Sequence, residues 1–316
     1  MNRNHLALFH AVAQAGSISG AAASVHVSQP AVSRQIGELE SALGVRLLDR
    51  LPRGCRLTEA GAILAGLASR WRAVENEAAR AMEEYRGLKR GRLTVGASMT
   101  IGGYLLPGML AAFHRRCPQI DLQVEIGNTS RIHQALVDGA VDAGLTEGPL
   151  QAEDVESAPF FQDELVPIAP PGHPLLRKGG VTARELCREP ILLREEGSGT
   201  RAVVERALRR RGIAVQPLLA LASPEAIKNA VAAGLGVAFV SRLVIEAEVR
   251  AGTLGIISVR DLSIRRPLHL RRARGRSVSP SLAIFLEILG ALKAPRLRDH
   301  NPRRKTGASE ASAAPA

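Results

Sequence analysis

The chain has 316 residues, of which 46% are hydrophobic and 3% aromatic, and it carries a formal net charge of +12. This length suffices for two or three domains with aliphatic cores, and no apolar run approaches the roughly 20 residues that a membrane-spanning helix needs. The N-terminus lacks a signal-peptide pattern, so we expect a cytoplasmic protein, and the positive charge favours an anionic partner such as nucleic acid.

The three cysteines are isolated and the eight histidines are scattered. They form no disulfide framework and no spacing typical of metal ligands. We therefore expect no metal site and no other cofactor.

Residues 5–15 have apolar side chains at helical spacing, and residues 17–43 carry two further helical patterns separated by a tight turn at His26 and Val27. Ser17 precedes the first of these two as a predicted N-cap, and Ser28 precedes the second, with Pro30 in its first turn. The positions expected to be buried are Ile18, Ala21, Ala22 and Val25 in the first, and Val32, Ile36, Leu39 and Leu43 in the second.

That assignment leaves Gln29, Ser33 and Arg34 on the exposed front of the second helix, where they can donate to base edges and phosphates in a major groove. Such a pair is a helix-turn-helix, although each side chain alone fits an ordinary surface helix equally well. Residues 47–58 follow as a wing-like hairpin with an Arg/Pro/Gly tip, suited to phosphates or a narrow minor groove. The predicted DNA contacts are Ser17, Ser19, Ser28, Gln29, Pro30, Ser33, Arg34, Arg50 and Arg53.

The string FHAVAQAGSISGAAASVHVSQPAVSRQIGELESALGVRLLDR, continued by LTEAG, resembles the LysR-type transcriptional regulators without gaps. The departures are Gly20 and residues 51–53, where that family more often has larger, charged or aromatic side chains. The resemblance is specific over residues 5–62 and continues more weakly to about residue 293. It implies an all-α winged helix-turn-helix at 1–58, a dimer on an inverted-repeat operator in double-stranded DNA, dimers that pair into tetramers, and contact with RNA polymerase.

Residues 59–90 predict a long linker helix, running to about Leu88, and then a hinge at Gly87 to Gly91. Its apolar positions alternate by four and three, the period of a coiled-coil seam. The seam could pack on its own chain or on a second copy, and the resemblance implies the second copy. The predicted dimer contacts are Leu64, Leu67, Trp71, Val74 and Ala78.

Residues 91–293 alternate predicted strands and helices, the pattern of an α/β fold. Strands are expected at 93–97, 122–126, 141–145, 165–169, 191–193, 218–221, 237–240 and 267–270, and helices at 101–116, 131–138, 201–211, 224–233, 242–251 and 279–292. These elements are expected to form two lobes, lobe I at about 91–163 and 268–293 and lobe II at about 164–267. The chain crosses twice between the lobes, an arrangement that resembles periplasmic ligand-binding proteins. Residues 294–316 are polar, basic and rich in Pro, Ala and Ser, so we expect a disordered tail.

Ligands of α/β sheets bind beyond the carboxyl ends of strands, at helix N-termini. Residues 96–100 and 197–201 are two such places, one in each lobe, and both offer hydroxyls and helix starts that suit a small anion. We expect a small anionic effector between the lobes. Its predicted contacts, each of which also fits a plain cap or turn residue, are Ser98, Thr100, Thr129, Glu147, Ser198, Thr200 and Arg201.

Two other functions compete. A serine hydrolase would use Ser98 and His269, but Thr100 takes the place of a glycine that the Gly-x-Ser-x-Gly elbow needs, so we expect no enzyme. A nonspecific architectural DNA binder would lack the roughly 200 residues that follow the linker. The sequence therefore predicts a DNA-binding regulator that responds to a small molecule.

Overall fold

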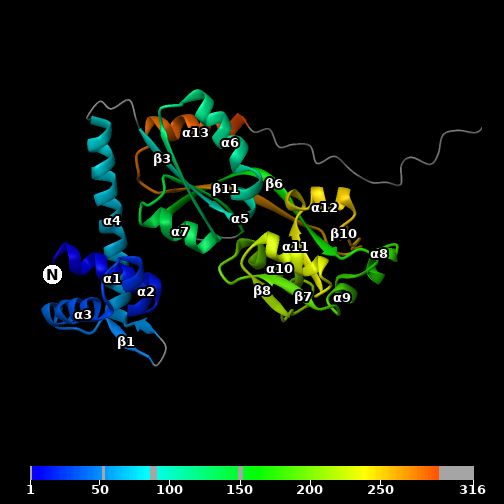
Figure 1. The fold of residues 1–316 in the computed structure, drawn as a ribbon, viewed down its shortest axis with the longest axis horizontal. Helices are drawn as coiled ribbons and strands as arrows, with labels where there is room; N and C mark the ends of the chain where they lie inside the picture. The colour runs from blue at the N-terminus through cyan, green and yellow to red at the C-terminus, as the bar shows by residue number, and fades with distance from the viewer. Residues whose placement is uncertain (1, 52–53, 86–90, 149–151, 292–316) are drawn as a thin grey trace, which may run out of the picture.

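The computed structural model describes residues 2–51, 54–85, 91–148 and 152–291. Figure 1 shows an N-terminal helical domain, a long helix α4 that rises from it, and an α/β part with two lobes. The predicted hinge at 87–91 and the predicted tail lie wholly or almost wholly outside the described residues.

The N-terminal domain packs three helices around an aliphatic core with Phe9, Val12, Val32, Ile36 and Leu39 all at most 1% exposed. Its elements are α1 (Arg3–Ala15), α2 (Ile18–Ser24), α3 (Gln29–Leu43), β1 (Leu48–Arg50) and β2 (Cys55–Leu57). The helix-turn-helix and its hairpin were thus predicted at the correct residues.

Two details of the helix ends differ from the prediction. Ser17 caps α2 by accepting from the Gly20 backbone N–H at 3.1 Å, as expected, whereas Ser28 stands at the N-cap of α3 without a side-chain capping hydrogen bond. Leu43 is 38% exposed instead of buried, because α3 ends there and Gly44 turns the chain away in a left-handed conformation.

The linker helix α4 (Glu59–Tyr85) has two unlike faces. Ala60, Leu64 and Ala65 pack against the core of the N-terminal domain. Leu67 and Val74 lie on another face and are 52% and 65% exposed. The predicted seam is therefore split: Leu64 packs on its own chain, Trp71 is half-buried, and Leu67, Val74 and Ala78 are exposed.

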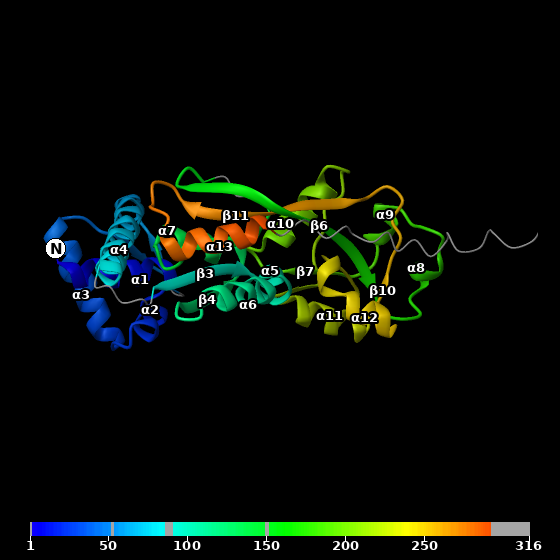
Figure 2. The ribbon, with the colours of Figure 1, turned by 90° about the horizontal axis from the view of Figure 1, so that it is seen from above.

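One nine-stranded mixed sheet runs through both lobes in the order β4-β3-β5-β11-β6-β9-β7-β8, with β10 paired to β6. Two long antiparallel strands, β6 (Val155–Ala169) and β11 (Ile264–Ala273), pass from one lobe into the other, as Figure 2 shows from above. The sequence predicted only the C-terminal third of β6 and the middle of β11, so the extent of this shared crossing was missed.

Lobe I contains the sheet edge around β3 and is covered on one face by α6 and α13 and on the other by α7 (Figure 1). Its elements are β3 (Arg92–Ser98), α5 (Met99–Tyr104), α6 (Leu106–Arg116), β4 (Asp121–Gly127), α7 (Thr129–Val137), β5 (Ala143–Glu147) and α13 (Pro280–Ala291). The single helix predicted over 101–116 is wrong: it breaks at Leu105, because Pro107 starts a new helix and lacks a backbone N–H.

Lobe II contains the other half of the sheet and two further core clusters. Its elements are α8 (Pro174–Arg177), α9 (Ala183–Leu186), β7 (Ile191–Arg194), α10 (Gly199–Arg209), β8 (Leu219–Leu221), α11 (Pro224–Ala232), β9 (Val237–Ser241), η1 (Arg242–Val244), α12 (Glu246–Ala251) and β10 (Gly255–Ile256). The helix predicted over 242–251 is a 3-10 turn followed by a short α-helix. The very short α8, α9 and β10 were not predicted.

Candidate DNA-binding surface and effector site

Helix α3 has a buried back and a polar front. Val32, Ile36 and Leu39 lie in the core, while Gln29 and Arg34 are exposed. Of the remaining predicted DNA contacts, Ser19, Ser28 and Pro30 are exposed and Ser17 and Ser33 are half-buried. A helix anchored in this way can enter a groove without disturbing the core behind it.

The hairpin β1–β2 is held against the start of the helix-turn-helix. The Cys55 backbone N–H donates to the Gly16 carbonyl at 2.8 Å, and Gly54 has a positive φ of 94° close to the same carbonyl. A Cβ at Gly54 would lie 2.7 Å from that oxygen, so only glycine fits here. Arg53 and the side chain of Arg50 lie outside the described residues.

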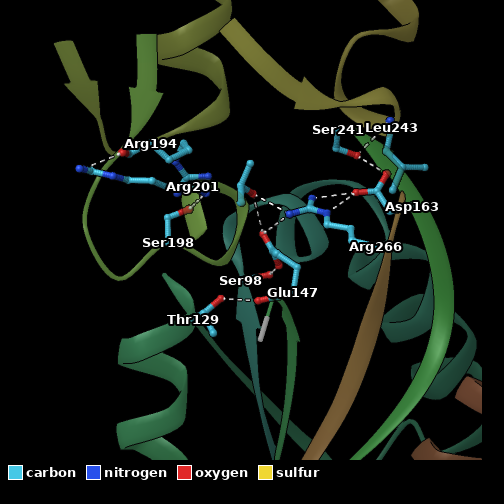
Figure 3. A network of polar contacts seen from close by, with 12 residues as sticks. Ser98, Thr129, Glu147, Asp163, Arg194, Ser198, Arg201, Ser241, Leu243 and Arg266 are labelled. Atoms are coloured by element: carbon cyan, nitrogen blue, oxygen red, sulfur yellow. Dashed lines mark hydrogen bonds and ion pairs between the residues drawn. The ribbon is translucent and has the colours of Figure 1, made fainter. Parts of the chain in front are cut away.

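Four of the predicted effector contacts meet between the lobes, at the carboxyl ends of β3 and β5 and at the start of α10 (Figure 3). Ser98 donates to the Glu147 carboxylate from lobe I, and Thr200 donates to it from lobe II at 3.3 Å. Thr129 donates to the Glu147 backbone carbonyl at 2.9 Å. All four residues are at most 4% exposed. The Glu147 carboxylate therefore occupies the hydroxyl donors that we predicted for an anion.

A buried arginine that the sequence did not reveal completes this site. Arg266 on β11 donates to Thr200 Oγ1 at 2.8 Å and to Asp163 Oδ2 at 2.8 Å, and its Nη1 lies 3.8 Å from Glu147 Oε1 (Figure 3). Ser241 donates to the other oxygen of Asp163 at 2.7 Å. The network contains one cation, Arg266, and two carboxylates, Glu147 and Asp163. As long as both carboxylates stay in place, this excess of negative charge favours the binding of a cation or a proton.

The other predicted effector contacts lie at the edge of this network. Thr100 and Thr200 line a residual cavity of only about 10 Å³, so the cleft is closed. Ser198 caps α10 by accepting from the Arg201 N–H at 3.5 Å. The Arg201 side chain turns to Glu205, to which it donates at 2.8 Å, and to the Arg194 carbonyl. Arg201 is thus beside the cleft but already paired.

Further hydrogen bonds hold the two lobes together. The Ser130 N–H donates to the Gly197 carbonyl at 3.2 Å, and the Asn128 amide donates to the Glu196 carbonyl at 3.2 Å. On another side, Lys228 Nζ of lobe II donates to the Tyr104 hydroxyl of lobe I at 3.0 Å. Burial disfavours the charge on Lys228, but its hydrogen bonds, first of all to Glu248, outweigh burial and raise its pKa.

Comparison with known proteins agrees with both halves of this architecture. A family model described as "Bacterial regulatory helix-turn-helix protein, lysR family" matches residues 3–62, and one described as "LysR substrate binding domain" matches residues 86–293. The chain belongs to the LysR family of transcriptional regulators. It is therefore a regulator with a helix-turn-helix and an effector-binding domain, as the sequence predicted.

Among LysR relatives, a "Probable RuBisCO transcriptional regulator" of Cyanidioschyzon merolae is 38% identical over 84% of this chain and 90% of its own length. The "Uncharacterized HTH-type transcriptional regulator YeiE" of Escherichia coli is 36% identical over 92% of this chain and 98% of its own. Among solved structures, the regulatory domain of Synechocystis CcmR in complex with 2-PG has a TM-score of 0.60 at 29% identity, covering 64% of this chain and 97% of that one.

Within the described ranges, no single helix is long and apolar enough to cross a membrane. The pair α1 and α2 reaches that length and composition only jointly, and the two helices are bent by 117° relative to each other.

Proposed function

We propose that this LysR regulator reads an operator through the front of α3 and that a small anion bound between the lobes controls this binding. The observation that carries the proposal is the division of α3 into a buried apolar back and a front with exposed Gln29 and Arg34. Gln pairs well with adenine and Arg with guanine in the major groove. Because the ligand is chromosomal DNA, we expect the protein to act in the cytoplasm.

We further propose that two copies bind an inverted repeat. Leu67, Val74 and Ala78 of α4 are exposed on the face that does not pack on the N-terminal domain, and a second α4 would cover them. A symmetric dimer presents two recognition helices to two half-sites. We extend this to pairing of dimers and to contact with RNA polymerase at the promoter, as the family resemblance implies.

The effector that we propose is a small anion that takes the place of the Glu147 carboxylate. Ser98, Thr200 and Arg266 are donors that converge on one point, and they are already arranged for a negative group. The binding of 2-PG by the CcmR regulatory domain supports this class of ligand. For binding to occur, the lobes would open and Glu147 would swing out of the site.

The DNA contacts can be tested on the cognate operator by fluorescence anisotropy. Gln29→Ala and Arg34→Ala should each weaken binding by about 1–3 kcal/mol and relax the sequence preference. Arg53→Ala should weaken binding to all sequences alike and reduce its salt dependence. If Gln29→Ala and Arg34→Ala leave affinity and preference unchanged, α3 does not read the operator.

The effector site can be tested by calorimetric titration of the full-length chain with 2-PG. Ser98→Ala and Thr200→Ala should weaken binding at least tenfold, because each removes a hydrogen bond to a charged ligand. Glu147→Gln should strengthen it, because the competing charge is gone. Unchanged affinity in all three variants would refute this site.

A catalytic function has less support. The Ser98 hydroxyl donates to Glu147, whereas a hydrolase would need a histidine there as a base. We therefore propose that the chain acts by binding and is not an enzyme. A nonspecific architectural DNA binder would not need a closed, charged cleft between two lobes, so we favour the regulator.

A further inference from the structure

A second cavity, of about 410 Å³, lies outside the interlobe cleft, between α10 and the crossing strand β11. Val203 and Ala207 of α10 form part of one wall, and Pro267 of β11 forms part of the other. Gly148, which follows β5 in lobe I, also lines the cavity. The walls thus come from both lobes, and the volume is that of a site for a small molecule.

The cavity is strongly basic, and none of the described residues that line it is Asp or Glu. We call it the arginine pocket. Its charged and titratable lining residues are Arg206, Arg210, Arg211, Arg265, Arg266 and His269.

Most of these arginines have no acidic partner in the part of the chain that the structure describes. Arg206, Arg210 and Arg265 are exposed, and none of them forms an ion pair with any residue that the structure describes. Arg211 donates to the backbone carbonyl of Asp261 at 2.6 Å, which leaves its positive charge without compensation. Arg266, by contrast, is neutralised by Asp163 on the cleft side. Guanidinium groups around a concave surface repel one another. An anion that binds among them offsets this repulsion and accepts hydrogen bonds from them.

A buried guanidinium next to the pocket also indicates a site for an anion. Arg271, 1% exposed, donates from Nη2 to the Gly148 carbonyl at 2.8 Å, and Gly148 is part of the pocket wall. Its Nε and Nη1 have no hydrogen-bond partner among the described residues, and the same holds for Nδ1 of His269. Buried guanidinium N–H groups without partners are costly, so those of Arg271 beside the pocket indicate a missing acceptor.

We propose that the arginine pocket is a second ligand site that binds a small polyanion, a metabolite with two or more phosphate or carboxylate groups. A ligand with a single charge would leave most of the guanidinium groups uncompensated, whereas a polyanion accepts from several at once. The site shares Arg266 with the cleft but is otherwise separate from it, because its exposed arginines lie on α10 and at Arg265 of β11. Through Arg266 and Gly148 it nevertheless touches both lobes.

The test is calorimetric titration of the full-length chain with inorganic pyrophosphate and, separately, with citrate. The double variant Arg206→Gln/Arg265→Gln removes two free arginines of the pocket. The matched control Arg209→Gln/Arg184→Gln removes the same charge from exposed positions outside the pocket lining, one of them on the same helix. We expect saturable binding to the unaltered chain, a loss of tenfold or more in the pocket variant, and a change of less than about twofold in the control.

Three results would overturn the proposal: absence of saturable binding to the unaltered chain, an equal loss in the two double variants, and loss of pyrophosphate binding in Ser98→Ala/Thr200→Ala, which would place the probe in the cleft. A pocket variant that weakens DNA binding but not pyrophosphate or citrate binding would likewise overturn it, in favour of a nucleic-acid surface. The circular dichroism spectrum and the thermal midpoint should be unchanged in both double variants, which would show that a loss of binding does not come from misfolding.

Discussion

Arg266 is the residue at which the two lobes of the effector domain share one buried charge. It is 2% exposed and contacts Asp163, where lobe I ends on the neighbouring strand, and Thr200 of lobe II. Such a cation is stable inside a protein only while carboxylates compensate it, and the carboxylates are stable only with the cation. Arg266, Asp163 and Thr200 therefore hold the crossing strands β6 and β11 and the start of α10 in one arrangement.

Removal of this cation should be far more costly than removal of a surface arginine. We expect Arg266→Ala to lower the free energy of unfolding by about 3–5 kcal/mol, because Asp163 and Glu147 remain buried without a counter-charge. Arg272→Ala on the same strand removes an ion pair with the half-exposed Glu156 and should cost about 1 kcal/mol or less. Chemical denaturation of both variants gives the comparison, and equal costs would contradict the role of Arg266.

Two partly buried histidines should make the stability depend on pH. Burial, and then the charge of Arg271, lower the pKa of both His133 and His269, although Asp154 and Asp138 oppose the shift at His133. The unfolded chain therefore binds more protons than the folded one below about pH 6.5, and stability falls as the pH falls through that value. The thermal midpoint should drop between pH 7.5 and 5.5, and less so in His133→Gln/His269→Gln. An identical drop in this variant would contradict the account.

Helix α4 shows how one element can serve two partners. Its inner face is covered by its own N-terminal domain, while Leu67 and Val74 point away from it. A helix of 27 residues with an uncovered apolar stripe is stabilised when a second helix covers that stripe.

The role of this apolar stripe in dimerisation can be tested by replacing its apolar side chains with charged ones. Leu67→Glu/Val74→Glu should shift the protein from dimers or larger assemblies towards monomers, because carboxylates would face each other across the interface. Ala62→Glu, an exposed position of α4 away from the stripe, should leave the assembly state unchanged. Light scattering coupled to size exclusion measures both. A dimer that survives Leu67→Glu/Val74→Glu would show that α4 is not the interface.

Periodicity predicted elements well wherever local chemistry decided them. The N-terminal helices, α7, α10, α11 and α13 occur within a few residues of their predicted ranges, because apolar spacing and caps are local signals. The break at Leu105 and the long N-terminal extension of β6 were missed. The N-terminal part of β6, residues 156–159, is exposed and gains its order from pairing with β11, more than 100 residues away.

The molecule as a whole joins its DNA-binding and effector domains through a small polar contact. His10 of α1 lies 3.3 Å from Asp138 at the end of α7, and Asn76 of α4 donates to the Asp138 carbonyl at 3.1 Å. Burial disfavours the Asp138 carboxylate, but the hydrogen bond with His10 helps to lower its pKa. This contact links lobe I directly to α1 and to the linker helix α4.

The sequence predicted only some residues of the candidate effector site, because local signals identify strand ends and helix starts but not pairing between distant strands. Ser98, Glu147 and Thr200 end strands or begin helices, so the general position of ligands in α/β sheets identified them. Asp163 and Arg266 are cross-strand partners, and that register follows from the whole nine-stranded sheet. No local pattern in the sequence shows that these two residues face each other.

Recognition of specific DNA through α3 can be tested by capturing genomic fragments with the full-length protein and sequencing them. The variant Gln29→Ala/Arg34→Ala is treated in parallel at the same protein concentration. We predict that the unaltered protein enriches a small set of fragments that share an inverted repeat, and that the double variant loses this enrichment. Uniform coverage of the genome by the unaltered protein, or the same enriched fragments with the double variant, would contradict recognition through α3.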